Sequence, residues 1–231
     1  MGAAFDLSLI VTFIPKLLGH LGVTFEILIA SICFGIVVGL LLAMIRYYNI
    51  PILKQFVIVY VSFIRGTPII IQLFLVFYGL PEILSLIGID IKRMDALIFV
   101  IITYSLSNAA SFSEIFRGAL IAVNKGQIEA AQSIGMTTWQ SFVRIVFPQS
   151  LRIAFPNIGN TVIGSLKDTS LAFTIGVMDI MGRGETLIAA TMHALEVYIA
   201  LSIIYYIIVL ILERGFKWSE RSINKHNPQH I

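Results

Sequence analysis

The feature that most constrains the fold is the apolar run at residues 22–45, in which Glu26 is the only charged residue. A helix over this run is ~36 Å long, which exceeds the ~30 Å hydrocarbon core of a bilayer. Hydrophobic residues make up 58% of the chain and charged residues 13%, with a mean hydropathy of +0.92. A water-soluble domain carries roughly 25% charged residues. The sequence therefore predicts an all-α protein of the membrane.

Five stretches are long and apolar enough to cross a membrane. We expect them to form a single transmembrane domain over residues 1–231. Residues 4–20 are apolar on one side but too short to cross, so they form either a helix lying flat on the membrane surface or an irregular coil. The five expected spans lie at about 22–45, 55–81, 96–116, 153–178 and 195–212.

The first two spans differ in their small residues and prolines: the second contains a helix break, and the first contains a face suited to close helix packing. In the second span, the sequence FIRGTP at 63–68 breaks the helix at Gly66 and Pro68. Backbone groups that such a break frees within a membrane need protein or a water-filled cavity beside them. In the first span, small residues recur every four positions and let another helix approach closely; they are Ser31, Gly35, Gly39 and Ala43.

Polar side chains in the later spans indicate a helix contact or a wet path. Lys167 and Asp168 in the fourth span would each cost about 2.5–3.5 kcal/mol at the membrane centre without a partner or water. Either Asp168 pairs with a cation on another helix, such as Arg65, or the two charges contact a zwitterion. The third span contains a further set that cannot all face lipid: Ser105, Ser107, Asn108, Ser111, Ser113 and Glu114.

The basic residues predict the orientation, because the loops that carry most of them face the cytoplasm. One side holds the turn at 46–54, the loop at 125–148 with its flanks, and the tail. That side has ten basic residues against four, with Arg65 and Lys167 inside spans and uncounted. We therefore expect the N-terminus outside and the C-terminus in the cytoplasm. The ten are Arg46, Lys54, Arg117, Lys125, Arg144, Arg152, Arg214, Lys217, Arg221 and Lys225, and the four are Lys16, Lys92, Arg93 and Arg183.

The cytoplasmic loop at 125–148 has helix signals of its own. Gly135 follows a helix-forming run and is placed to end it in the left-handed conformation. Thr137 and Gln140 have the spacing of a capping box, which starts a second short helix. We expect Pro148 to stop that helix. Its apolar stripe suits docking into a groove of another protein and consists of Trp139, Phe142, Val143 and Val146.

Several kinds of chemistry are not indicated. The sequence has no G-x-x-x-x-G-K-[ST] loop, so we expect no binding of ATP through a phosphate loop. No Ser/His/Asp or Cys/His set is apparent, Cys33 has no cysteine partner, and the histidines are scattered. We therefore predict no catalytic residues, no metal site and no bound cofactor. The net charge of +3 reflects membrane orientation and does not indicate nucleic-acid binding.

Three segments resemble the polar amino-acid permeases of ABC importers and follow in that family's order over most of the chain. They are FIRGTPIIIQLFLVFYGLP (63–81), EIFRGAL…GQIEAAQSIG (114–135) and FPQSLRIAFPNIGN…SLKDTSLA (147–172). The run E-A-A-x3-G-x9-I-x-x-P resembles the coupling loop of these permeases, with Phe147 where the family usually has Leu. The later segments SLAFTIGVMDIMGRGETLI (170–188) and HALEVYIALSIIYY (193–206) are similar to L-cystine permease subunits of Gram-positive bacteria.

This resemblance implies a type I importer transmembrane domain with five helices in the bacterial cell membrane. It implies an ATPase dimer that holds ATP and Mg²⁺, a second permease subunit, identical or paralogous, and an extracytoplasmic amino-acid-binding protein. With the apolar stripe, it predicts ATPase-coupling residues at Glu129, Ala130, Ala131, Gly135, Trp139, Phe142, Ile145 and Pro148. The predicted substrate pathway comprises Lys167, Asp168, Thr169, Ser170, Arg65, Thr67, Gln72, Ser107 and Asn108.

The predicted function is ATP-driven import of a polar amino acid, with ATP hydrolysed on a partner chain. L-cystine is the first candidate substrate. Glutamine, arginine or histidine is the alternative substrate. A gradient-driven secondary transporter would show related halves with paired broken helices, and we detect no such repeat. A structural scaffold would explain the cytoplasmic loop but leaves Arg65, Lys167 and Asp168 without a role.

Overall fold

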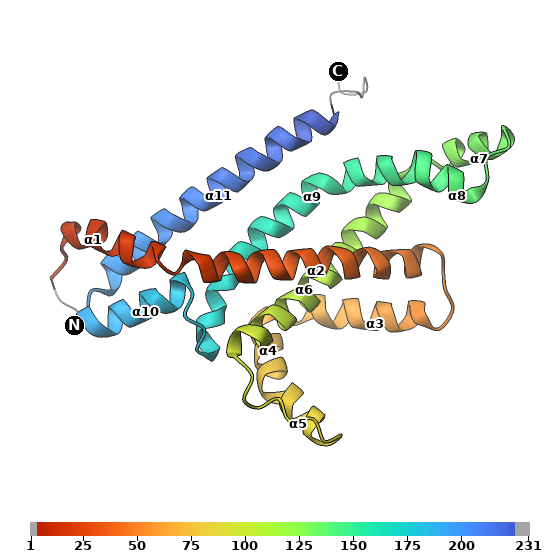
Figure 1. The fold of residues 1–231 in the computed structure, drawn as a ribbon. Coiled ribbons are helices and arrows are strands. Elements are labelled where there is room, and N and C mark those ends of the chain that lie inside the picture. The colour runs from red at the N-terminus through yellow and green to blue at the C-terminus, as the bar shows by residue number, and fades with distance from the viewer. Residues whose placement is uncertain (1–3, 225–231) are drawn as a thin grey trace.

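The structure is a computed structural model, and it describes residues 4–224, in which the regular structure is all helical (Figure 1). The long helices are α2 (Leu21–Tyr47), α6 (Ala96–Ala122), α9 (Phe147–Asp168) and α11 (Ala194–Asn224). A broken segment comprises α3 (Leu53–Gly66), α4 (Ile69–Phe74), the π-helix η1 (Leu75–Gly79) and α5 (Leu80–Ser85). The shorter elements are α1 (Leu7–Leu18), α7 (Lys125–Ser133), α8 (Thr138–Ser141), the π-helix η2 (Phe142–Val146), the 3₁₀ helix η3 (Thr169–Ile175) and α10 (Ile180–Thr191).

Membrane-spanning character follows from length and apolarity. Within the described part of the chain, α2, α6 and α11 are each long and apolar enough to cross, and the broken segment from α3 to α5 qualifies when taken as one bent span. Helix α9, at 22 residues, is long enough but more polar. These five segments correspond to the five expected spans. The fourth differs from the expected bounds, because α9 starts at Phe147 and gives way to η3 at Thr169.

Helices α2 and α6 pack tightly against each other. A Cβ added to Gly35 would lie 2.6 Å from Cβ of Asn108, and one added to Gly39 would lie 2.7 Å from Cβ of Phe112. Ser31 and Ala43, on the same side of α2, are also buried. The prediction of a close helix contact along this face is therefore confirmed.

The break in the second predicted span lies where the sequence places it, but its geometry was not predicted. Helix α3 ends at Gly66, and the helical segment that begins at Ile69 turns away from it by 112°. The sequence predicted a break at this point but not this change of direction. In Figure 1, α4 and α5 project away from the bundle.

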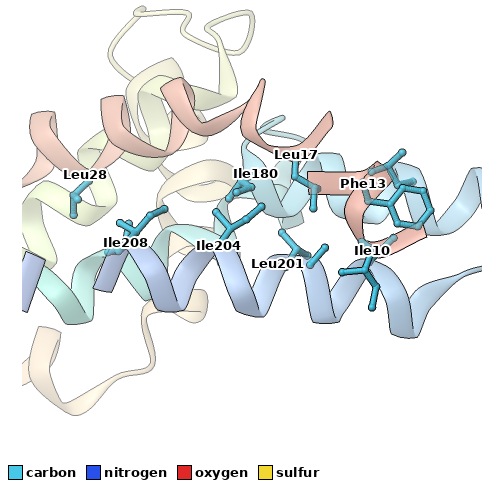
Figure 2. Close-up of a cluster of buried hydrophobic side chains, with 12 residues drawn as sticks. Ile10, Phe13, Leu17, Leu28, Ile180, Leu201, Ile204 and Ile208 are labelled. Atoms are coloured by element: carbon cyan, nitrogen blue, oxygen red, sulfur yellow. The ribbon is translucent and has the colours of Figure 1, made fainter. Parts of the chain in front are cut away.

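Helix α1 forms at the end of the molecule that lies opposite α7 and α8 (Figure 1), so the irregular-coil alternative is wrong. Asp6 caps it by accepting hydrogen bonds from Ser8, and these bonds lower the pKa of the Asp6 carboxyl. The buried side of α1 packs on α10 and α11 in the cluster of Figure 2. Its labelled residues are Ile10, Phe13, Leu17, Leu28, Ile180, Leu201, Ile204 and Ile208.

Candidate functional site

The first half of the predicted coupling loop is a short, capped helix, α7. The Asn124 side chain accepts from the backbone N–H of Gly126 at 2.8 Å and starts it. Gly135, at a φ of +86°, ends it. The N–H of Gly135 donates to the Gln132 carbonyl at 2.9 Å, and the N–H of Met136 donates to the Ala131 carbonyl at 3.1 Å, which is the Schellman pattern. The predicted role of Gly135 as a helix terminator is confirmed.

The second half begins with the predicted capping box. The Thr137 N–H donates to Oε1 of Gln140 at 2.9 Å, and the Gln140 N–H donates to Oγ1 of Thr137 at 3.2 Å. The expectation that Pro148 stops this helix is wrong, because α8 continues through η2 into α9 without interruption. Pro148 lies just after the π-helix η2, where the regular pattern of i→i−4 hydrogen bonds is already interrupted.

Phe142 anchors this segment to the membrane helices. It is buried, and its ring centroid lies 6.3 Å from that of Tyr47 and 6.1 Å from that of Tyr48, at the end of α2. Trp139 stacks on it at 5.9 Å but remains 68% exposed. Of the predicted apolar stripe, Phe142 and Val146 are therefore buried, whereas Trp139 and Val143 lie at the surface. The apolar stripe of this segment therefore has a buried part, which holds it against the membrane helices, and an exposed apolar part.

Most of the other predicted coupling residues gather around an open hollow of about 620 Å³ between α7 and the start of α9. Ala130, Ala131, Ile145 and Pro148 line it. Glu129 is exposed and lines a separate hollow between α7 and the ends of α2 and α6. Arg144 and Arg152 also line the first hollow. Residues 125–148, which we call the coupling segment, thus present an apolar hollow with basic residues to their surroundings.

One face of α9 carries polar residues at spacings of three and four positions. Three of its side chains are exposed and two are half-buried. Gly164 lies on the same face, and a Cβ there would meet nothing within 4 Å, so the face is open. We call this face the polar stripe; its side chains are those of Asn157, Asn160, Thr161, Lys167 and Asp168. Asn157 and Asp168 are eleven positions apart, so the stripe extends ~16 Å along the helix.

The Asn157 end of the polar stripe opens into a charged hollow. Two adjoining hollows of about 440 and 350 Å³ share Arg65 and Glu114. Asn157, Asn160 and Thr161 line the second one. The structure therefore brings Arg65 and the polar stripe of α9 to one surface. Within residues 4–224, Arg65, Lys167 and Asp168 make no ion pair, so the predicted alternative of an Arg65–Asp168 pair is wrong.

Glu114 is the ion-paired centre of this hollow. Its carboxylate accepts from the Arg46 guanidinium of α2 and from Nη2 of Arg117, one turn along α6, at 2.8 Å. Arg65 lines the same hollow without a carboxylate partner in the described chain. One acid against three bases leaves a local excess of positive charge, which favours a negatively charged group.

Two predicted pathway residues have local structural partners at the helix break. Pro68 has no N–H to donate to the Ile64 carbonyl, and Nε2 of Gln72 donates to it instead at 2.7 Å. The same amide nitrogen donates to the carbonyl and hydroxyl oxygens of Thr67 at 2.9 and 3.1 Å. The Gln72 side chain thus satisfies the Ile64 and Thr67 carbonyls at the break.

Asn108 joins three helices. Its amide donates to Oγ of Ser31 on α2 at 3.3 Å and accepts from Oγ of Ser165 on α9 at 2.6 Å. All three side chains are buried. Asn108 is therefore held between helices and does not line the open surface, whereas Ser107 beside it is half-buried.

The end of α9 is closed by bonds to its own carbonyls. The hydroxyls of Thr169 and Ser170 donate to Leu166 and Lys167, each at 2.7 Å. The Tyr104 hydroxyl donates to the Asp168 carbonyl at 2.7 Å. Beside this closed end the Lys167 side chain is exposed and that of Asp168 is half-buried.

Sequence reasoning missed part of this site. Asn157, Asn160 and Thr161 lie on the same face as Lys167 and Asp168, and the three- and four-residue spacing of the polar positions is the signal that could have identified them. The pairing of Glu114 with Arg46 has no comparable signal, because it depends on the register of two helices 68 residues apart in the chain.

A bundle of membrane-spanning helices with an open polar face and a capped helical segment at one end defines a subunit of a membrane transporter. The chain belongs to the binding-protein-dependent transport system inner membrane component family, whose model matches residues 35–225. Relatives in this family are permease subunits of ABC transporters and not enzymes. The structure has the type I importer fold of that family.

Individual relatives cover nearly the whole chain. It is 55% identical over 231 residues to the L-cystine transport system permease protein TcyL of Bacillus subtilis, covering 100% of this chain and 97% of that protein. It is 33% identical over 217 residues to the glutamine transport system permease protein GlnP of Escherichia coli, covering 94% and 97%. A solved amino acid ABC transporter with histidines matches with a TM-score of 0.85 at 27% identity, covering 95% of this chain and 100% of that one.

Proposed function

We propose that this chain is the permease subunit through which an ATP-driven importer carries a polar amino acid, and that the amino acid is L-cystine. The full-length identity of 55% to an L-cystine permease supports this substrate. Glutamine is the second candidate, supported by the 33% identity to a glutamine permease.

The observation that carries the proposed route is the open polar stripe of α9. Charged and amide side chains within a membrane do not face lipid, because they need a partner or water. Within residues 4–224 the side chains of Asn157, Asn160, Lys167 and Asp168 have no hydrogen-bond or ion-pair partner, which favours a covering protein or a water-filled path beside the stripe. A second permease subunit, identical or paralogous, fits this requirement and leaves a wet path between the two subunits.

The charges along this path suit a zwitterion. The guanidinium of Arg65, in the positive hollow around Glu114, is available to a substrate carboxylate. At the other end of the stripe, the carboxylate of Asp168 is available to an ammonium group. Such contacts can act in sequence as the substrate moves along the helix.

The coupling segment is the proposed contact for an ATPase dimer, which would hold ATP and Mg²⁺. Its outer surface carries Glu129, Trp139 and the hollow at Ala131 and Ile145, whereas Phe142 ties its base to α2. A displacement imposed on this segment would therefore reach both α2 and α9. The excess of basic residues at this end supports a cytoplasmic position for the segment. An extracytoplasmic binding protein would deliver the substrate at the end where α1 and α10 lie.

Uptake in proteoliposomes tests this proposal. The complex of permease and ATPase subunits, with its binding protein, should accumulate radiolabelled L-cystine when ATP is present on the coupling-segment side. Excess unlabelled glutamine should not compete. Uptake that continues without ATP and collapses when an ionophore dissipates the ion gradient would instead establish a secondary transporter.

The coupling role is tested by Gly135→Arg. We expect the variant to insert and assemble but to lose ATP-driven uptake, because a bulky cation at the end of α7 blocks the ATPase contact. Gly88→Arg is the matched control: Gly88 has a φ of +81°, against +86° at Gly135, and neither position has a neighbour within 4 Å of an added Cβ. Equal uptake by both variants would refute the coupling role.

A further inference from the structure

Two sides of the end of α11 differ in how their charges are compensated. Glu213, Lys217 and Glu220 line a hollow against α9, and Nζ of Lys217 lies 3.7 Å from a carboxylate oxygen of Glu213. Arg214 and Arg221 are exposed on the other side and have no ion pair within residues 4–224. The exposed side therefore carries uncompensated positive charge.

The same side of α11 is apolar over the preceding three turns. Ile203, Ile207 and Ile211 follow each other at four-residue spacing and are 39%, 50% and 62% exposed. The face then continues with Trp218, which is 75% exposed. An exposed apolar row that ends in an aromatic residue between two arginines matches the passage from acyl chains to lipid headgroups.

We propose that Arg214, Trp218 and Arg221 form a binding surface for the headgroups of anionic phospholipids in the leaflet where α11 ends. Two guanidinium groups flank the indole at spacings of three and four residues, so a single headgroup phosphate can contact both. Charge complementarity selects an anionic lipid over a zwitterionic one. The inference rests on the proposed orientation only in naming this leaflet as the cytoplasmic one.

Native mass spectrometry of the intact detergent-solubilised complex tests this surface, with phosphatidylglycerol and phosphatidylcholine added separately. Wild-type complex should retain phosphatidylglycerol in preference to phosphatidylcholine, and added salt should weaken the retention. The double variant Arg214→Gln/Arg221→Gln should bind phosphatidylglycerol more weakly by roughly fivefold for each arginine removed. Size-exclusion chromatography verifies that the variant still assembles.

The control is Lys92→Gln/Arg93→Gln, which removes two exposed basic residues from the loop before α6. It should leave phosphatidylglycerol binding within twofold of wild type. An equal loss in control and test variants, or equal binding of the two lipids by wild type, overturns the proposal. Selective binding that arises only after the ATPase subunits are removed also overturns it, because the face would then belong to the protein partner.

ATP-driven uptake measured on the same preparations separates the two proposals. Selective lipid binding by a complex that does not transport L-cystine would overturn the proposed function and support the lipid surface. L-cystine transport by a complex without lipid selectivity would support the proposed function and overturn the lipid surface.

Discussion

Two regions of the molecule contain polar residues within membrane-spanning helices: the α2–α6 contact and the polar stripe of α9. The two regions differ in whether these residues have partners in the described chain. Between α2 and α6, Asn108 has partners for its amide within the chain, at Ser31 and Ser165. On α9, Asn160 and Lys167 are exposed. The role of a polar residue in a span therefore depends on the location of its hydrogen-bond partner. A partner in the same chain indicates helix packing, whereas the lack of such a partner indicates contact with a second molecule.

The largest expected effect is at the tight contact. Gly39→Leu should lower the free energy of unfolding by about 3 kcal/mol or more, because the added Cβ would lie 2.7 Å from Cβ of Phe112 and 2.9 Å from the Ala109 carbonyl oxygen. Thermal unfolding of the purified subunit in detergent measures this. Gly22→Leu, on the same helix with no neighbour within 4 Å, should have no such effect. Equal melting temperatures for both variants would contradict close packing.

An intermediate effect is expected where the two regions meet, at Glu114. Glu114→Gln should destabilise the subunit by roughly 2 kcal/mol, because Arg46 and Arg117 would lose their shared carboxylate in a partly buried setting. Thermal unfolding again gives the measurement. Glu220→Gln, which removes a carboxylate without an ion pair in the described chain, is the control and should leave the melting temperature unchanged. A similar loss in both variants would show that the arginine contacts contribute nothing.

The smallest effect on stability is expected at Asn108, and comparison with Asn160 tests the difference between the α2–α6 contact and the polar stripe most directly. Asn108→Ala should cost about 1 kcal/mol, because two interhelical hydrogen bonds are lost. Asn160→Ala should leave the melting temperature unchanged and lower L-cystine uptake. Measuring unfolding and uptake on both variants tests this assignment. The reverse result, with Asn160→Ala unstable and Asn108→Ala defective only in transport, would exchange the roles of the two positions.

Local signals predicted much of the fold. The four-residue recurrence of small residues identified the face at Gly35 and Gly39, because close helix approach depends on residues of a single helix. The terminator at Gly135 and the capping box at Thr137 are likewise decided by neighbours within a few residues. Such features need no knowledge of the rest of the molecule.

Features that depend on two elements could not be read in this way. A proline can end a helix or stand within one beside an irregular turn, and the π-helix that precedes Pro148 allows the second arrangement here. The 112° bend after Gly66 is likewise unspecified by FIRGTP, which predicts a break but no direction. Arg65 was predicted at the site, yet its proximity to Glu114 depends on how α3, α6 and α9 pack.

The π-helix η2 fixes how far α9 is rotated relative to the coupling segment. A π-turn takes up one residue more than an α-turn, and one residue corresponds to about 100° of helix rotation. Deleting a single residue within 142–146 would therefore rotate Asn157 and Asp168 by about 100° away from their present direction without altering either side chain. Homologues of this chain should tolerate length changes in the loop at residues 86–95 and conserve the number of residues between Thr137 and Asn157.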